Sequence, residues 1–177
     1  MASAFAHAAA ALAISRLKLI NKPAACLVFT GIVLSILPDI DSIGFNLGVP
    51  YNSFWGHRGF THSVTFSFSI SAVLPFIFSK VEPKARWRIM AFLFFCNISH
   101  ALLDAMTTGG LGVAFFSPFN NTRYFFNFRS IKVSPLSVTE FFNGNGFAVL
   151  KSEAIWIGIP TVLIYIISLL VQQIRRK

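Results

Sequence analysis

The chain has 177 residues, of which 55% are hydrophobic and only 12% are charged, and its mean hydropathy is +0.67. So few polar residues cannot cover a soluble globule of this size, and the composition therefore predicts an integral membrane protein with a single domain over residues 1–177. The net charge of +9 does not indicate nucleic-acid binding, because the basic residues lie mostly between apolar stretches and not on one face of a soluble fold.

Five apolar stretches predict an all-α, polytopic helix bundle with about five membrane-embedded helices. The last two stretches approach the ~20 residues that a helix needs to cross a bilayer, whereas the first two are shorter. Between the stretches, residues 38–61 and 107–153 are rich in turn-forming or polar residues and are predicted to be loops, with Pro38 ending the helix before it. The five stretches are residues 2–15, 24–37, 63–79, 87–106 and 154–174.

Three basic groups orient the predicted helices. If all three face the cytoplasm, the positive-inside rule is satisfied, and the N-terminus lies outside and the C-terminus inside. The groups are Arg16, Lys18 and Lys22; Lys80, Lys84, Arg86 and Arg88; and Arg175, Arg176 and Lys177.

Most of the few histidines and acidic residues of the chain fall into one pattern. At ~1.5 Å per helical residue, four separate segments carry them about 16 to 27 Å away from the cytoplasmic charges, into the outer half of the membrane. Carboxylates and imidazoles are costly in an apolar environment unless a metal or a partner satisfies them, so their convergence predicts a metal site at the outer side. The predicted metal ligands are His7, Asp39, Asp41, His62, His100 and Asp104.

Local spacing supports this prediction, although each element also has a structural explanation. His100 and Asp104 are four residues apart and share one helix face. Asp39 and Asp41 are two residues apart at a predicted helix end, where they would bind a cation or form an interfacial turn. His7 alone would equally be a packing residue.

Two further features of the sequence have alternative explanations. Thr61 precedes an apolar helix and would cap it. The aromatic residues between Phe115 and Phe128 are explained as an interfacial belt or as part of a substrate site.

These motifs resemble the YdjM-type family of bacterial inner-membrane proteins. The resemblance runs from His7 to about Arg123 and implies a metal-dependent hydrolase of the inner membrane. It is carried by Pro38-Asp39-Ile40-Asp41, His57-Arg58-Gly59-Phe60-Thr61-His62-Ser63, His100-Ala101-Leu102-Leu103-Asp104 and Thr107-Thr108-Gly109-Gly110, followed by Pro118.

A fainter similarity points to the all-helical fold of zinc-dependent phospholipases C and single-strand nucleases, which cleave phosphodiesters. The N-terminal tryptophan ligand of that fold is absent here, as are its later histidine and glutamate, so one or two ions are expected instead of three. The mixed histidine and carboxylate set favours zinc, with manganese as the alternative.

The mechanism expected from these residues is hydrolysis of a phosphate ester by a metal-activated water. His57 would act as an acid–base or outer group, and Arg58 and Arg123 would bind the phosphate through charge-assisted contacts. A site near the headgroup layer favours a membrane lipid or a lipid-linked phosphate as substrate. The sequence also leaves open a transporter or a non-hydrolytic metal-binding protein, because intramembrane histidines and aspartates also build ion pathways.

Overall fold

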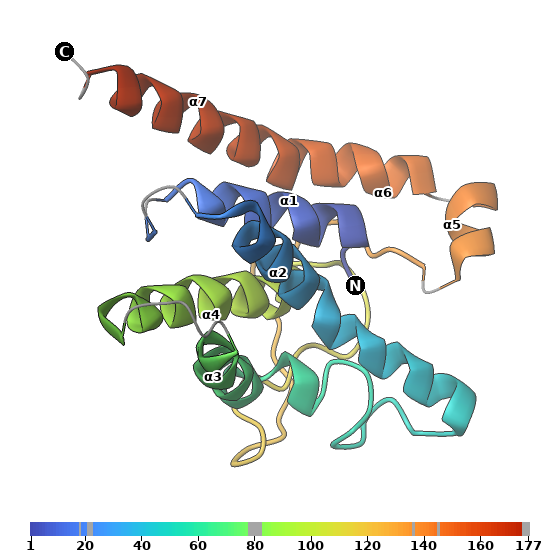
Figure 1. Ribbon diagram of the computed structural model, residues 1–177. Helices are drawn as coiled ribbons and strands as arrows, with labels where there is room; N and C mark the ends of the chain where they lie inside the picture. The colour runs from blue at the N-terminus through green and yellow to red at the C-terminus, as the bar shows by residue number, and fades with distance from the viewer. Residues whose placement is uncertain (18, 21–22, 78–82, 136, 145, 175–177) are drawn as a thin grey trace.

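The computed structural model describes residues 1–17, 19–20, 23–77, 83–135, 137–144 and 146–174, and it confirms the all-α membrane bundle (Figure 1). Among the described residues, three helical stretches are long and apolar enough to cross a membrane, namely Ala25–Leu47, Ala85–Ala105 and Gly146–Ile174, and two shorter apolar helices accompany them. In chain order the elements are α1 (Ala4–Ser15), α2 (Ala25–Ile36), η1 (Leu37–Leu47), η2 (Phe60–His62), α3 (Val64–Val73), η3 (Leu74–Phe76), α4 (Pro83–Ala105), α5 (Val138–Asn143), α6 (Gly146–Glu153), η4 (Ala154–Gly158) and α7 (Ile159–Ile174).

The apolar core lies where α1, α2 and α4 pack together. Gly31 on α2 allows the close approach of α4, because a Cβ atom at this position would lie 2.9 Å from the Phe92 ring. Small residues at helix contacts are typical of membrane bundles, where close packing replaces the hydrophobic driving force. The buried members of this core are Ala11, Leu27, Leu34, Ile89, Phe92, Leu93 and Cys96.

Helix α2 ends at Ile36, just before Pro38, as predicted, but the chain does not become a loop there. The chain continues from α2 into the 3-10 helix η1, and the helical stretch extends to Leu47. Pro38 occupies the first turn of η1, a position at which proline is tolerated. The second membrane stretch is therefore longer than the sequence predicted, and its extension carries Asp39 and Asp41.

The C-terminal helix also begins earlier than predicted. Helix α6, the π-helical turn η4 and α7 run continuously from Gly146 to Ile174, so part of the predicted loop 107–153 is helical. Glu153 falls inside this apolar run because its carboxylate accepts hydrogen bonds of 2.6 Å from the backbone N–H and the hydroxyl of Ser3. Figure 1 shows α7 lying along α1 at one side of the bundle.

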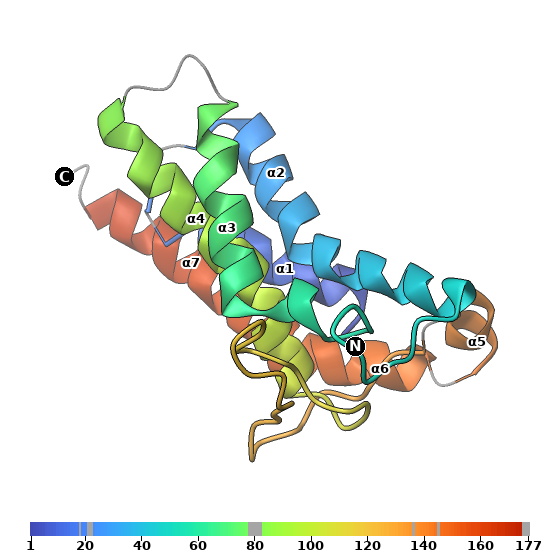
Figure 2. The same cartoon turned by 90° about the horizontal axis from the view of Figure 1, so that it is seen from below.

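The chain between α4 and α5 forms an irregular layer over one end of the bundle (Figure 2). Val113 and Tyr124 exchange two backbone hydrogen bonds of 2.9 Å, and Ala114 donates one of 3.0 Å to the Arg58 carbonyl. This layer therefore joins the turn that precedes η2. Ser63, not Thr61, caps α3, since its hydroxyl accepts a hydrogen bond of 3.0 Å from the backbone N–H of Phe66.

Most of the basic residues used to orient the helices, Lys18, Lys22, Lys80 and residues 175–177, lie outside the described part of the chain. The direction of the bundle in the membrane therefore stays a prediction.

Candidate metal centre

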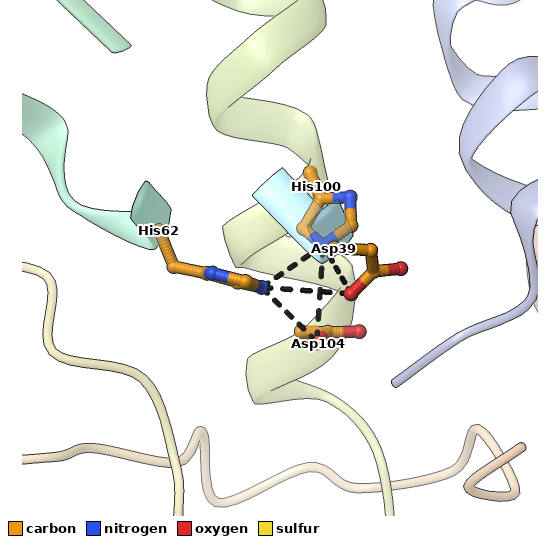
Figure 3. A group of neighbouring side chains, drawn as sticks. All are labelled: Asp39, His62, His100 and Asp104. Carbon is orange, nitrogen blue, oxygen red and sulfur yellow. Dashed lines mark hydrogen bonds and ion pairs between the residues drawn. The ribbon is translucent and has the colours of Figure 1, made fainter. Parts of the chain in front are cut away.

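Four buried side chains from three elements converge at one point (Figure 3). Asp39 comes from η1, His62 from the end of η2, and His100 and Asp104 from successive turns of α4. All four are at most 8% exposed. Each directs one imidazole nitrogen or carboxylate oxygen inward, and these atoms lie within 4.8 Å of one another.

The separations match the size of a tetrahedral metal site. The His62 Nε2 atom lies 3.0 Å from His100 Nε2, 3.8 Å from Asp39 Oδ1 and 3.7 Å from Asp104 Oδ2. His100 Nε2 lies 3.3 Å from Asp39 Oδ1 and 3.9 Å from Asp104 Oδ2. A tetrahedron with metal–ligand bonds of about 2.0 Å has edges of about 3.3 Å, so the cluster needs only small movements to close around zinc.

Hydrogen bonds at the outer ring nitrogens hold both imidazoles in a metal-binding orientation. His100 Nδ1 lies 2.7 Å from the Ser35 carbonyl and therefore donates to it, which leaves Nε2 with a lone pair. His62 Nδ1 lies 3.1 Å from Asp41 Oδ2, so that its Nε2 also faces the centre. A carbonyl or carboxylate behind a ligating histidine is a recurrent feature of metal sites.

Unsatisfied buried atoms provide an independent test of whether the residues fit a cation. Both carboxylate oxygens of Asp39 and both ring nitrogens of His7 are buried without a hydrogen-bond partner. A buried carboxylate that accepts no hydrogen bond is costly, and a bound cation would remove that cost. The donor set therefore fits a divalent metal.

His7 lies beside the cluster and not within it. Its ring stacks on the ring of His100 with centroids 3.7 Å apart, and its Nε2 atom is 3.7 Å from Asp104 Oδ1. His7 would need a small shift to reach the centre, so its role as a metal ligand stays a prediction.

Asp104 has surroundings quite different from those of Asp39. Its Oδ1 atom accepts a hydrogen bond of 2.7 Å from the Ala2 backbone N–H, and its Oδ2 atom accepts one of 2.9 Å from Arg58 Nε. Both oxygens of Asp104 are thus already partly satisfied by the protein.

Arg58 is a fully buried part of this centre. Besides Asp104, its guanidinium donates to the Gly109 carbonyl at 2.9 Å and to the Thr107 hydroxyl at 3.0 Å. A side chain at Gly110 would displace Arg58, because its Cβ atom would lie 2.6 Å from the guanidinium Nη1 atom. Arg58 also has a positive φ of 62°, a strained conformation that bulky residues adopt mostly at functional sites.

Asp41 lies behind the cluster and organises two histidines. Its Oδ1 atom is 2.6 Å from His57 Nδ1, and its Oδ2 atom contacts His62 Nδ1 and accepts a hydrogen bond of 2.5 Å from the Thr61 hydroxyl. Asp41, His57 and His62 form a second group with metal-ligand spacing, which shares His62 with the first.

The surrounding carboxylates dominate the electrostatics of His62. Burial alone would lower its pKa, but contacts with Asp104, Asp39 and Asp41 outweigh burial and raise the pKa to about 10. The site therefore favours a positive charge at this imidazole, which a proton or a metal ion can supply. For His57, burial outweighs the contact with Asp41, and its pKa is lowered.

Arg123 lies outside the cluster and supports the loop that bears His57. Its guanidinium donates to the carbonyls of His57 at 2.7 Å and Tyr51 at 2.8 Å, and it stacks over the Tyr51 ring at 5.4 Å. Neither this residue nor Arg58 is far from the centre, but both are bound to protein atoms, and their role in phosphate binding stays a prediction.

Three further residues contribute to this site with little or no signal in the sequence. Ser35 contributes only its carbonyl, and Ala2 only its N–H, so neither residue type signals a role. Thr107 had a recognisable signal, because it stands in the Thr-Thr-Gly-Gly motif, but its partner Arg58 could not be inferred from spacing.

Comparison with known proteins gives one family and one curated relative. A family model described as YdjM inner membrane protein matches residues 1–176. The inner membrane protein YbcI of Escherichia coli (strain K12) is 38% identical over 138 residues, which are 78% of this chain and 80% of the relative. No solved structure matches the chain significantly.

Proposed function

Because the chain belongs to the YdjM family and is a bacterial inner-membrane protein, we propose that its buried cluster makes it a membrane-embedded, metal-dependent hydrolase of phosphate esters. The family and the site are compatible with a metal-dependent enzyme, and the hydrolytic step is the proposal.

The contrast between Asp39 and Asp104 carries this proposal. Asp39 has two unsatisfied oxygens, and its Oδ1 atom lies 3.3 Å from His100 Nε2 and 3.8 Å from His62 Nε2, so Asp39, His62 and His100 form a set of three ligands. Both oxygens of Asp104 already accept hydrogen bonds, which weakens this carboxylate as a fourth ligand. Three protein ligands with an open fourth position are typical of catalytic zinc sites, whereas structural sites have four protein ligands.

A zinc ion held by these residues would lower the pKa of a bound water toward neutrality and polarise a phosphoryl oxygen. Manganese is the alternative, and one ion is sufficient for the three-ligand set. Asp104 would accept a hydrogen bond from the water, and Arg58 would keep Asp104 ionised and correctly oriented. Asp41 would hold His62, and His57 would transfer protons to the leaving group.

Exposed apolar side chains near the site support a lipid or lipid-linked phosphate as substrate. Around the end of the bundle that holds the cluster, Leu47 is 76%, Trp55 64% and Phe119 89% exposed. Large apolar residues at the surface of a membrane protein face lipid, so a substrate with acyl or polyprenyl chains would reach the cluster from the bilayer. In the proposed topology this end faces the periplasm.

Metal content and hydrolysis test the proposal together. Detergent-purified protein should contain about one zinc or manganese per chain and should cleave a phospholipid or a polyprenyl phosphate. Asp39→Asn should lose both the metal and the activity, whereas Glu140→Gln, which removes an exposed carboxylate on α5, should lose neither.

The outcomes separate the parts of the proposal. Loaded protein that hydrolyses only a soluble phosphodiester would exclude the lipid substrate. Well-folded protein that takes up neither zinc nor manganese would exclude the metal centre.

A second candidate function, metal-ion transport, is favoured by one observation. Buried polar groups continue from the cluster between the helices: the Ser67 hydroxyl donates to Asn97 Oδ1 at 2.7 Å, and Asn97 Nδ2 donates to the Leu34 carbonyl at 2.8 Å. Such bonds also join helices in membranes without conducting ions. Zinc flux into proteoliposomes that Asn97→Leu abolishes would favour transport over hydrolysis.

A further inference from the structure

A groove between α1 and α7 lies apart from the metal centre. Its volume is about 230 Å³, and its walls are almost entirely apolar. Figure 1 shows these two helices side by side, with α7 continuing beyond the end of α1. The groove is lined by Leu12, Ala13, Arg16, Thr161, Val162 and Tyr165.

One cation lies at this otherwise apolar groove. The Arg16 guanidinium stacks over the Tyr165 ring at 4.3 Å from its centroid. All ion pairs between described residues belong to the metal centre, so none neutralises Arg16 in this part of the structure. Tyr165 precedes Ile174 by nine residues, which places Arg16 beside α7 at ~13.5 Å from its last described residue.

A charged side chain next to a membrane helix requires a partner or access to the headgroup layer. The phosphate of an anionic lipid satisfies a guanidinium through charge-assisted hydrogen bonds, and the apolar groove beside it fits an acyl chain. Basic pockets between membrane helices are known to recognise anionic headgroups in this way. We infer that the α1–α7 groove binds an anionic phospholipid of the bilayer, with the phosphate on Arg16 and an acyl chain between the helices.

Arg16 also has a purely structural role, which the test must separate. It is the C-cap residue of α1, and a cation at a helix C-terminus is favourable. If capping were its whole role, Arg16→Gln would lower the thermal stability and leave lipid preference unchanged.

Native mass spectrometry of the full chain in detergent provides the test. Phosphatidylglycerol and phosphatidylcholine with identical acyl chains are titrated separately onto the protein. We expect wild-type protein to bind phosphatidylglycerol about tenfold more tightly, the size that one charge-assisted contact supplies. Arg16→Gln should reduce this preference to about twofold or less.

Two further variants make the result specific. Arg88→Gln removes an exposed arginine that stacks on Trp87 at 5.6 Å, so it matches the loss of charge and of stacking and should keep the preference. Val162→Trp should fill the groove and weaken the binding of both lipids, because Val162 lines the groove and is 56% exposed. Equal binding of the two lipids by wild type, or an unchanged preference in Arg16→Gln, would overturn the inference. Elution of each variant as a single symmetrical peak in gel filtration serves as the folding control and does not depend on the metal centre.

Discussion

Helices α4 and α7 are both apolar and belong to stretches long enough to cross a membrane, yet they have opposite surroundings. In its most apolar part, 56% of the α4 stretch is buried within the protein, compared with 11% of the stretch that contains α7. Helix α4 contacts α1, α2 and α3 and carries His100 and Asp104, whereas α7 presents most of its apolar side chains outward.

The difference shows that apolar side chains have two separate roles in this chain. On α7 they provide a surface for lipid, so most positions there tolerate any apolar residue. On α4 they provide a packed interior that holds the buried polar side chains of His100 and Asp104 in place. The mean hydropathy is 1.3 for the α4 stretch and 2.4 for the α7 stretch. The less apolar of the two stretches is thus the one that carries residues of the site.

The largest expected effect on stability comes from removing Arg58, the buried cation next to α4. Arg58→Met removes the guanidinium that donates to Asp104 in the interior and so breaks a buried ion pair, which should destabilise the protein by about 3–5 kcal/mol. Arg129→Met is the matched control, since Arg129 is exposed and stacks on Phe125 at 4.8 Å. Unfolding free energies in mixed micelles provide the measurement, and equal losses in both variants would contradict the role given to Arg58.

Creating a cavity in each helix tests the comparison of α4 with α7 without changing any charged residue. Leu93→Ala on α4 removes a fully buried side chain and should cost about 2–5 kcal/mol. Leu170→Ala on α7 removes one that is 52% exposed to the bilayer, where lipid chains fill the space, and should cost less than about 1 kcal/mol. The comparison fails if the two unfolding free energies decrease by the same amount.

A smaller effect, on metal affinity, is expected from changing Asp41, which lies behind the ligands. Asp41→Asn should lower the metal affinity by about 10- to 100-fold, because Asp41 orients His62 without reaching the centre. Competition with a chromophoric zinc chelator measures this change, and Glu140→Gln should leave the affinity unaltered. A complete loss of metal would instead make Asp41 a direct ligand.

The pH dependence is the smallest and most specific effect. With a pKa raised to about 10, His62 carries a proton in the metal-free protein at neutral pH, and metal binding must displace that proton. Affinity should therefore rise about tenfold per pH unit below the raised pKa and decrease as the pH falls. The same chelator competition at several pH values, corrected for protonation of the chelator, gives the slope. A slope of zero would show that His62 does not ligate.

The raised pKa of His62 also affects the metal-free protein. The stabilisation that it provides is complete below the unfolded-state pKa of about 6.5. It is lost as the pH rises through the folded-state pKa of about 10.

The sequence was sufficient to predict the convergence of His62, His100 and the aspartates, because ligand-type residues are rare and costly in an apolar chain. It did not distinguish Asp39 from Asp41, which differ only in the face of a 3-10 helix that the sequence did not predict. The continuation past Pro38 and the helical start at Gly146 depend on tertiary contacts, such as that of Glu153 with Ser3. These contacts join residues 150 positions apart and leave no local pattern.

The continuation of α2 into η1 has a consequence for biogenesis. When the stretch Ala25–Leu47 leaves the ribosome, it carries two aspartates whose partners at residues 57–62 and 100–104 have not yet been synthesised. Each aspartate adds up to about 2.5–3.5 kcal/mol to the cost of entering the bilayer, depending on its depth. This stretch should therefore wait at the translocon until α4 emerges, and the two should enter the lipid as a pair.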